Sequence, residues 1–336
     1  MNMEILMEWM NTPVMGKSLG LWTVFLGIVT TLLVFDLGIL NRKDHEIGVK
    51  ESLWLSAGYV TIACLFGAWV WNHLGRDSGI DFYTGYLVEQ SLSMDNLFVM
   101  LLVFKSFSVP PIYQHRVLFW GIIGVIVMRG IMIGLGAAIV SRFDWVLLLF
   151  GAFLFFSGIK MLLMASKDDD AVEENRVVRF LRKRFHITED FHGHDFFTKL
   201  HHPELGRAVW HATPLFLALV TIEIADLIFA VDSVPAVFAI TTDPYIVYTS
   251  NIFAILGLRS LYFALAAMLH RFIYLKYALS LILIFIGAKV FYAHYVGHVD
   301  PMVSLGVTFG LLAGSIVLSL LRTQPNAQDG TQGPGP

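Results

Sequence analysis

Long apolar runs dominate the chain and predict a bundle of membrane-spanning helices. Each run is long enough to cross the roughly 30 Å of bilayer hydrocarbon as an α-helix. Transmembrane β-strands need only about ten residues and alternate apolar with polar positions. Runs of this length and continuity therefore predict an all-α, polytopic membrane protein of about nine transmembrane helices. The runs lie at residues 18–40, 51–73, 82–107, 115–140, 143–165, 212–240, 247–269, 272–293 and 300–321.

The amino-acid composition also indicates a membrane protein. Hydrophobic residues make up 56% of the 336 residues, charged residues make up 15%, and the mean hydropathy is +0.68. Soluble domains are rarely so apolar or so poor in charge, so we expect a lipid bilayer around the chain and no nucleic-acid partner. The single cysteine, Cys64, excludes an internal disulfide or a dithiol redox pair. We expect neither an enzyme nor a bound cofactor, and an association with itself or with other membrane proteins stays open.

The distribution of Lys and Arg predicts the orientation in the membrane. If the N-terminus is outside, sixteen of the 23 basic residues fall in cytoplasmic segments, three fall in outer segments, and four lie within spans. Cytoplasmic loops of membrane proteins carry such an excess of positive charge. We therefore predict an outer N-terminus and a cytoplasmic C-terminus, which agrees with an odd number of spans.

The connection at 166–211 divides the chain into a five-span part, 1–165, and a four-span part, 212–321. It begins with acidic residues and turns basic in RVVRFLRKRF at 176–185, where apolar residues recur at roughly helical spacing. Two interpretations stay open for this segment, a solvated cytoplasmic connector or an amphipathic helix against the anionic inner leaflet. The tail at 322–336 is polar and rich in Gly and Pro, which predicts disorder.

Histidines gather in the same connection, close in sequence to three acids. His-Gly-His at 192–194 is a weak metal-binding signal. A solvated polar loop is one interpretation of this cluster, and a cytoplasmic metal sensor is the other. The residues are His186, His192, His194, His201, His202 and His211, with Glu189, Asp190 and Asp195.

An internal repeat relates the third, fourth and fifth spans to the sixth, seventh and eighth. Two acids six residues apart recur in both units, and an Arg and a Lys follow them at nearly the same separation. The third span runs inward and the sixth outward, so the units at 82–165 and 212–293 are predicted to be related by inversion, as in many secondary transporters. The matched pairs are Glu89 with Asp226, Asp95 with Asp232, Asn96 with Ser233, Arg129 with Arg259, and Lys160 with Lys289.

Carboxylates outnumber cations in and near the spans, by six to four. Each charge costs at least about 2–3 kcal/mol at the centre of a membrane helix, so these groups are expected to be paired or functional. One bound divalent cation, or protonation, would cancel the surplus of two negative charges. The carboxylates are Asp36, Glu89, Asp95, Glu223, Asp226 and Asp232, and the expected cation partners are Arg129, Lys160, Arg259 and Lys289.

Helical geometry places most of the acids on two matching stripes. At 100° per residue, side chains three, four and seven positions apart lie on one face of a helix. Asp36 is different, because it can simply cap the end of its helix at the interface. The stripes consist of Glu89, Ser93 and Asn96 in the third span and of Glu223, Asp226 and Ser233 in the sixth.

Asp95 and Asp232 lie about 120° from these stripes in an unbroken helix. Two arrangements stay open for them. Each can pair with an arginine, Asp95 with Arg129 and Asp232 with Arg259. Alternatively, the helix unwinds locally and brings both acids into the site, which Pro235 would favour in the sixth span.

The chemistry of these side chains predicts the class of ligand. Carboxylate, amide and hydroxyl oxygens, with no cysteine or histidine in the core, select hard cations. Magnesium, calcium and manganese fit this set, whereas copper and zinc fit it poorly. The candidate metal ligands are Glu89, Asp95, Asn96, Glu223, Asp226, Asp232 and Ser233.

Three segments resemble the TerC family of bacterial integral membrane proteins, and within it the Alx-like branch. They are EQSLSMDNLFV at 89–99, EIADLIFAVDSVPAVFAITTDP at 223–244 and TSNIFAILGLRSLYF at 249–263. The resemblance covers nearly the whole chain. It implies a location in the bacterial inner membrane, a relationship to LysE-type cation exporters, and a cation path along the acids named above.

The resemblance leads to two expectations about function. The first is export of Mn²⁺ from the cytoplasm by alternating access around a carboxylate site near the middle of the membrane. The second is a scaffold or redox modulator in stress response or tellurite resistance, without transport activity, whose embedded charges only hold helices together. The charge surplus and the inverted repeat favour transport.

Overall fold

The computed structural model describes most of the membrane-spanning part of the chain. It describes residues 11–36, 48–143, 145–164, 188, 191, 193–202, 207–266, 274–297 and 299–322, and at a few helical positions, among them Asp95 and Asp232, only the backbone. The predicted amphipathic segment at 176–185 and the tail beyond Arg322 lie outside the described residues.

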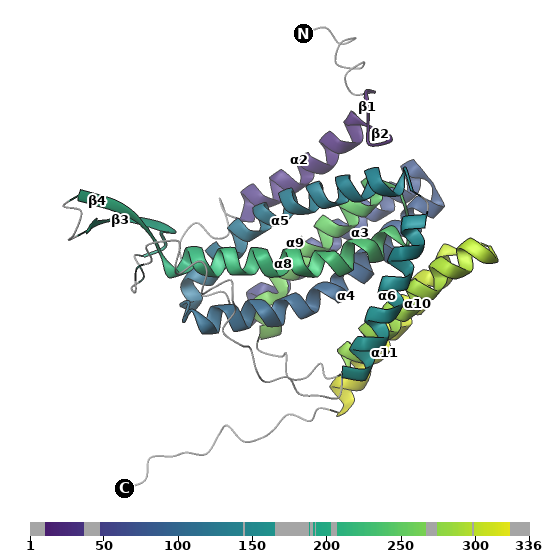
Figure 1. Ribbon diagram of the computed structural model, residues 1–336. Coiled ribbons are helices and arrows are strands. Elements are labelled where there is room, and N and C mark those ends of the chain that lie inside the picture. The colour runs from purple at the N-terminus through teal and green to yellow at the C-terminus, as the bar shows by residue number, and fades with distance from the viewer. Residues whose placement is uncertain are drawn as a thin grey trace.

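The described chain is predominantly helical, and its long helices lie side by side in a bundle (Figure 1). Seven of them, α3, α5, α6, α8, α9, α10 and α11, are long and apolar enough to cross a membrane. The helices are α2 (Leu19–Phe35), α3 (Val49–Leu74), α4 (Arg76–Ser106), α5 (Pro111–Val140), α6 (Trp145–Met164), α8 (Pro214–Phe238), α9 (Pro244–Ala266), α10 (Leu275–Tyr295) and α11 (Pro301–Arg322).

Two other described helices coincide with predicted spans but differ from a simple apolar span. Helix α2 has 17 residues, about three short of the length that usually crosses the hydrocarbon. Helix α4 has 31 residues, which is ample, but it carries six Asp, Glu, Lys and Arg residues. The nine-span count therefore stays a prediction.

Local sequence signals explain several helix boundaries. Four helices begin at a proline, Pro111, Pro214, Pro244 and Pro301. Proline fits the first turn because its φ is already helical and the N–H it lacks would have no partner there. Gly75 alone joins α3 to α4, with a φ of +98° that a side chain would strain.

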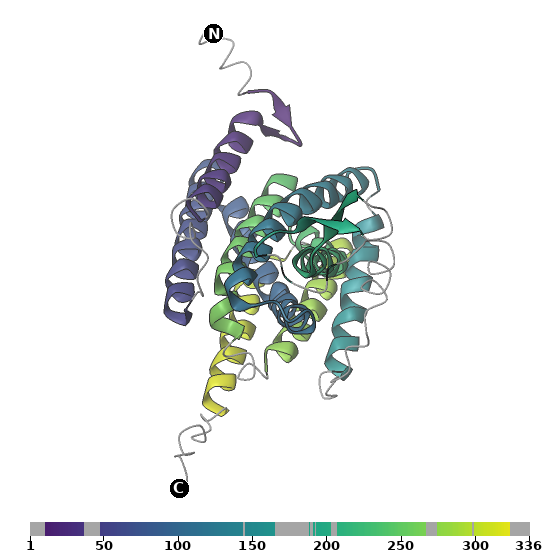
Figure 2. The same cartoon turned by 90° about the vertical axis from the view of Figure 1, so that its left-hand side faces the viewer.

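Two short β-hairpins depart from the all-α expectation. Strands β1 (Pro13–Val14) and β2 (Lys17–Ser18) precede α2. Strands β3 (Phe197–His202) and β4 (Arg207–Ala212) pair in antiparallel register before α8, and this hairpin points toward the viewer in Figure 2. The Lys199 ammonium lies 4.7 Å from the centre of the Trp210 ring across the pair. The sequence did not predict this pairing, because six-residue strands within a polar connection give only a weak alternating pattern.

The most extensive helix packing joins α6 to α10, α4 to α9 and α3 to α9, and α5 also packs against α8. Small residues let α6 and α10 approach closely, as is common in membrane helices. A Cβ atom added at Gly158 would lie 2.8 Å from the backbone oxygen of Ser280. A Cβ atom added at Gly287 would lie 2.6 Å from the backbone oxygen of Gly151. The two helices run antiparallel through this contact.

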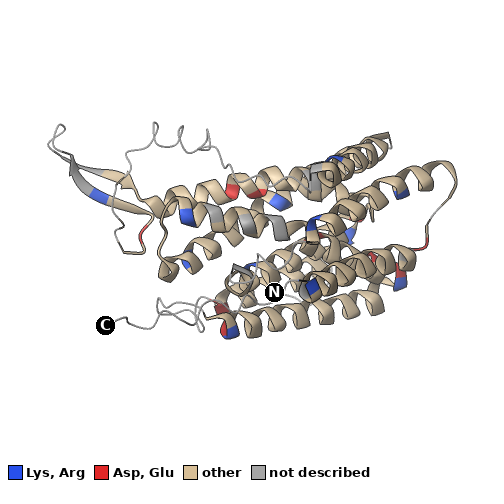
Figure 3. Ribbon diagram, turned by 90° about the horizontal axis from the view of Figure 1, so that it is seen from below, with Lys and Arg blue, Asp and Glu red and all other residues tan. Residues whose placement is uncertain are grey.

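Charged side chains are sparse along the described helices, as Figure 3 shows. Many apolar side chains on the outside of the bundle are exposed, including Leu135, Phe156 and Ile228. Large exposed apolar surfaces are rare on soluble proteins. The helix exteriors therefore suit contact with lipid.

The hairpin β3–β4 and the turn before α9 lie at opposite ends of α8, which gives a test of orientation. In a Cys64→Ala background, we expect Thr242→Cys to react with a membrane-impermeant maleimide in intact cells and His194→Cys to react only after lysis. Both positions are exposed, so accessibility is matched. The reverse labelling pattern would overturn the predicted orientation and the inversion argument with it.

Candidate functional site

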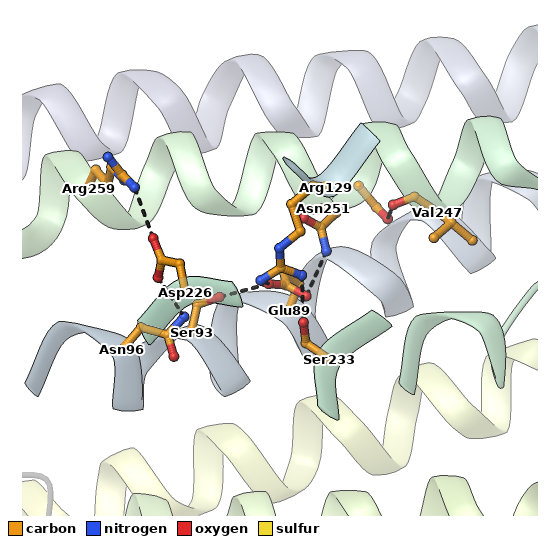
Figure 4. A network of polar contacts seen from close by, with 10 residues as sticks. Glu89, Ser93, Asn96, Arg129, Asp226, Ser233, Val247, Asn251 and Arg259 are labelled. Atoms are coloured by element: carbon orange, nitrogen blue, oxygen red, sulfur yellow. Dashed lines mark hydrogen bonds and ion pairs between the residues drawn. The ribbon is translucent and has the colours of Figure 1, made fainter. Parts of the chain in front are cut away.

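Two buried acid–arginine pairs lie where α4, α5, α8 and α9 meet (Figure 4). In the first, Nη2 of Arg129 lies 3.1 Å from Oε1 of Glu89. In the second, Nη2 of Arg259 lies 3.1 Å from Oδ2 of Asp226. At most 7% of each of these four residues is exposed. Removing a partner from such a pair leaves an uncompensated buried charge, so the pairs tie the four helices together.

Three further polar side chains form hydrogen bonds with the first pair. Ser93 donates from Oγ to Oε1 of Glu89 at 2.9 Å, and Asn251 donates from Nδ2 to Oε2 at 2.8 Å. Arg129 also donates from Nη1 to Oγ of Ser233 at 2.6 Å. Both carboxylate oxygens of Glu89 are therefore hydrogen-bonded, as a buried charge requires.

The second pair is held more loosely on its carboxylate side. Asn96 donates from Nδ2 to Oδ1 of Asp226 at 3.3 Å. Arg259 donates from Nη1 to the backbone oxygen of Leu118. One amide and one guanidinium are thus the hydrogen-bond donors that the described residues supply to Asp226.

Glu223 lies beside the second pair, one helical turn before Asp226. Its Oε1 is 4.0 Å from Nη2 of Arg259, which is an ionic contact too long for a hydrogen bond. Both of its carboxylate oxygens are buried, and neither has a hydrogen-bond partner among the described residues. Room for the carboxylate comes from α5, since a Cβ atom at Gly124 would lie 2.5 Å from Oε2 of Glu223. Glu223 is thus a half-buried residue whose two buried carboxylate oxygens have unused acceptor capacity.

A small cavity of about 70 Å³ adjoins the first pair, where Glu89 lines it. Asn96 also lines it, and the Oδ1 of Asn96 is buried without a hydrogen-bond partner among the described residues. The lining therefore combines carboxylate, amide and hydroxyl oxygens with apolar groups and one thioether. The lining residues are Glu89, Leu92, Ser93, Asn96, Met161, Phe229, Ser233 and Leu283.

Residues of the two predicted stripes lie close together, since Asn96 donates to Asp226. The carboxylates of Glu89 and Asp226 are paired with arginines, however, and are not free. Within the described part of the chain, no three His, Cys, Asp or Glu side chains gather closely enough to hold a metal ion. Arginines neutralise Glu89 and Asp226 instead. In this conformation the described acids are therefore arranged as ion pairs beside a cavity.

The structure tests one of the two arrangements considered for Asp95 and Asp232, the local unwinding of their helices. Helices α4 and α8 run unbroken through both acids, and α8 also continues through Pro235. The local unwinding hypothesis is therefore wrong for this structure. Pro235 stands in the last turn of α8, where the N–H that it lacks costs one backbone hydrogen bond at the helix end. Both side chains lie outside the described residues, so their pairing with arginine stays a prediction.

Other candidate residues lie elsewhere. Lys160 is exposed on α6 and Lys289 is half-buried on α10. Asp36 ends the described part of α2 and lies 3.4 Å, Oδ2 to Nε2, from His115. Among the loop histidines, the structure describes the side chains of His194 and His211. The predicted loop residues His186, His192, Glu189 and Asp190, together with the side chains of His201 and His202, lie outside the described residues.

Two residues of this site were not predicted from the sequence, Asn251 and Met161. Asn251 holds Glu89, yet a single asparagine in an apolar span carries no motif of its own. Met161 lines the cavity, but methionine is common in apolar helices and usually only packs. The internal repeat gives no signal for Asn251, because the matching position eight residues before Arg129 is Gly121.

Comparison with known proteins places this arrangement in a family. The family model described as the integral membrane protein TerC family matches residues 74–327, which include both acid–arginine pairs. The chain belongs to the TerC family. No solved structure matches it.

Several TerC relatives align over almost their full length. An uncharacterized membrane protein from Myxococcus xanthus is 47% identical over 312 residues, which cover 93% of this chain and 95% of the relative. An uncharacterized membrane protein from Rickettsia bellii is 44% identical over 301 residues, or 90% and 97%. A protein from Escherichia coli O6:H1, named as a proposed membrane-bound redox modulator, Alx, is 44% identical over 319 residues, or 92% and 96%.

The ion pair between Glu89 and Arg129 predicts a non-additive mutational effect. Arg129→Met should reduce the amount of folded protein, because it leaves a buried carboxylate unpaired at a cost of about 3–5 kcal/mol. Adding Glu89→Gln should restore about 1–3 kcal/mol of that loss. The measurement is the amount of monodisperse protein after detergent extraction. Strict additivity of the two changes would show that they are not coupled.

Proposed function

We propose that this TerC protein exports a hard divalent cation, with manganese the foremost candidate, from the cytoplasm through the cluster between α4, α5, α8 and α9. The observation that supports this proposal most directly is a set of buried acceptor oxygens without hydrogen-bond partners among the described residues. Asn96 presents Oδ1 and Glu223 presents both carboxylate oxygens without hydrogen-bond partners among the described residues. Buried acceptors of this kind are costly unless a ligand or a second conformation uses them. Oxygen ligands favour Mg²⁺, Ca²⁺ and Mn²⁺.

The packing of α6 against α10 supports the inverted repeat that this mechanism needs. In the repeat alignment, Gly158 corresponds to Gly287 and Gly151 corresponds to Ser280. Gly158 meets the backbone of Ser280, and Gly287 meets the backbone of Gly151. A contact that maps onto itself when the two partners exchange is the signature of a two-fold axis. Because the helices are antiparallel, such an axis would lie in the membrane plane, as in inverted-repeat transporters.

The two acid–arginine pairs also correspond across the proposed repeat. Each pair receives a polar group from the other unit, located seven residues after that unit's own acid. Asn96 thus donates to Asp226, and Ser233 accepts from Arg129. A change in the relative position of the two units would disturb both pairs together. Alternating access around this cluster is the motion that we propose.

The charge balance also favours a cationic substrate. Three described acids, Glu89, Glu223 and Asp226, face two arginines, which leaves one negative charge in excess. A divalent cation entering the cluster would interact with this excess charge and with the carboxylate that an arginine releases. We therefore propose that the arginines occupy the carboxylates between transport cycles.

The cavity lining favours a transition metal over Mg²⁺ and Ca²⁺. Met161 contributes a thioether beside the oxygen donors. Thioether sulfur is a soft ligand that Mg²⁺ and Ca²⁺ use poorly, and Mg²⁺ also loses its bound water reluctantly. Mn²⁺ accepts carboxylate oxygens and is the most oxygen-preferring of the common transition metals. This combination makes Mn²⁺ our preferred substrate.

A membrane scaffold remains the second candidate, and the ion pairs themselves favour it. Paired charges are sufficient to fix helix contacts without any transport. One relative is named as a proposed redox modulator. Within this chain, however, Cys64 is the single cysteine and is exposed on α3. A redox role would therefore need a partner molecule or a cofactor.

Cellular manganese distinguishes export from a scaffold. We expect expression of this protein to lower manganese content in a strain that lacks its own exporters. Glu223→Gln should reduce export at least about tenfold, because it removes charge worth at least about 1.4 kcal/mol to the transported ion. Protein levels should stay normal, since the amide nearly matches the carboxylate in size. Asp300→Asn, at the exposed start of α11, is the charge-matched control. Unchanged manganese with the well-expressed wild type would refute export.

Met161 should set the selectivity for manganese over magnesium. Met161→Leu preserves volume and packing but removes the sulfur. We expect it to retain transport and to lower the preference for Mn²⁺ over Mg²⁺ by about tenfold. Competition of Mg²⁺ with Mn²⁺ uptake into inside-out vesicles measures this preference. Met302→Leu, at an exposed methionine of α11, is the control. An unchanged preference in Met161→Leu would show that the thioether is only a packing group.

A further inference from the structure

The acid Glu223 breaks the correspondence between the two pairs. It stands three residues before Asp226, and the matching position before Glu89 is Tyr86. A second difference lies opposite it. Asn251 stands eight residues before Arg259, whereas the matching position before Arg129 is Gly121. One pair thus has an amide where the other has a glycine, and the second pair alone has an additional acid.

These two differences complement each other in space. Asn251 donates to Glu89 and completes its hydrogen bonding. At Gly121 no side chain is present, and a Cβ atom there would collide with the guanidinium of Arg259 and lie 2.9 Å from Oε1 of Glu223. The space beside Arg259 is therefore occupied by a carboxylate instead of by an amide.

Arg259 consequently lies between two carboxylates. Its Nη2 is 3.1 Å from Asp226 and 4.0 Å from Glu223. A shift of about 1 Å would exchange a hydrogen bond to Asp226 for one to Glu223, given usual N–H···O distances of about 2.9 Å. Among the described residues, Glu89 is the one acid that lies within ion-pair distance of Arg129.

We infer that Glu223 is the acceptor that takes Arg259 from Asp226 when the transported cation binds. This inference rests on the proposed function and deepens it. The cation would bind Asp226 and the unpartnered Oδ1 of Asn96, while the arginine stays paired with Glu223. No buried charge is left uncompensated at any stage, which avoids the large cost of an isolated ion in the membrane. Glu223 is then a positioning residue, which acts through Arg259.

Replacing Glu223 and Arg259 with glutamine, singly and together, tests whether Glu223 acts through Arg259. Glu223→Gln traps Arg259 on Asp226, so Mn²⁺ binding to the purified protein should weaken at least about tenfold. In Glu223→Gln combined with Arg259→Gln, the arginine no longer competes, and affinity should return to within about threefold of the wild type. The double variant should also bind Mn²⁺ within about threefold of Arg259→Gln alone, because Glu223 acts through Arg259. If Glu223 were a ligand of the ion, the double variant would bind at least about tenfold more weakly than Arg259→Gln alone. The electron paramagnetic resonance signal of free Mn²⁺ measures binding directly.

A structure of the unaltered protein with Mn²⁺ provides a second test that does not depend on variants folding. We expect Mn²⁺ on Asp226 and Nη2 of Arg259 within hydrogen-bonding distance of Glu223. Mn²⁺ bound directly to Glu223, or Arg259 still paired with Asp226 beside a bound ion, would overturn the inference while leaving export intact. Failure of the wild type to bind or export Mn²⁺ would instead overturn the proposed function itself.

Discussion

Charge buried in a membrane protein must be compensated, and this constraint governs the centre of the bundle. Glu89 and Asp226 each lie within 3.1 Å of an arginine from another helix. Four helices must therefore keep a fixed register, since separating either pair would expose an ion to a medium that solvates it poorly. The glycines of α5 leave room for the additional carboxylate of Glu223 within the same core.

The same constraint connects structure to the proposed transport. In the proposed cycle, a buried carboxylate can release a cation only if another positive charge replaces it. The arginines provide that replacement charge, and the acceptor oxygens of Asn96 and Glu223 supply places that the described ion pairs do not use. The difference between the two pairs also gives them different tasks. Glu89 accepts from three side chains and Asp226 from two, so in the proposed cycle Glu89 stays fixed and Asp226 exchanges its partner.

Much of this arrangement follows from sequence, because spacing along a helix determines which side chains share a face. Glu89 and Ser93 were predicted to lie on one stripe, and they are hydrogen-bonded. The ion-pair partner of Arg129 could not be predicted from the sequence, because the packing of the helices determines which acid an arginine reaches. Asn251 and Met161 also required the fold, because they reach the site from other helices. The β3–β4 hairpin was missed because its strands are short and polar.

Transport by the purified protein is the most direct test of the account. Reconstituted into liposomes that contain a manganese-sensitive fluorophore, the wild type should carry Mn²⁺ across the bilayer at a rate that saturates with Mn²⁺ concentration. Saturation is the expected result because the cluster binds the ion before it moves. A flux no greater than that of protein-free liposomes, from protein that is folded and correctly inserted, would contradict the account and favour a scaffold held together by its ion pairs.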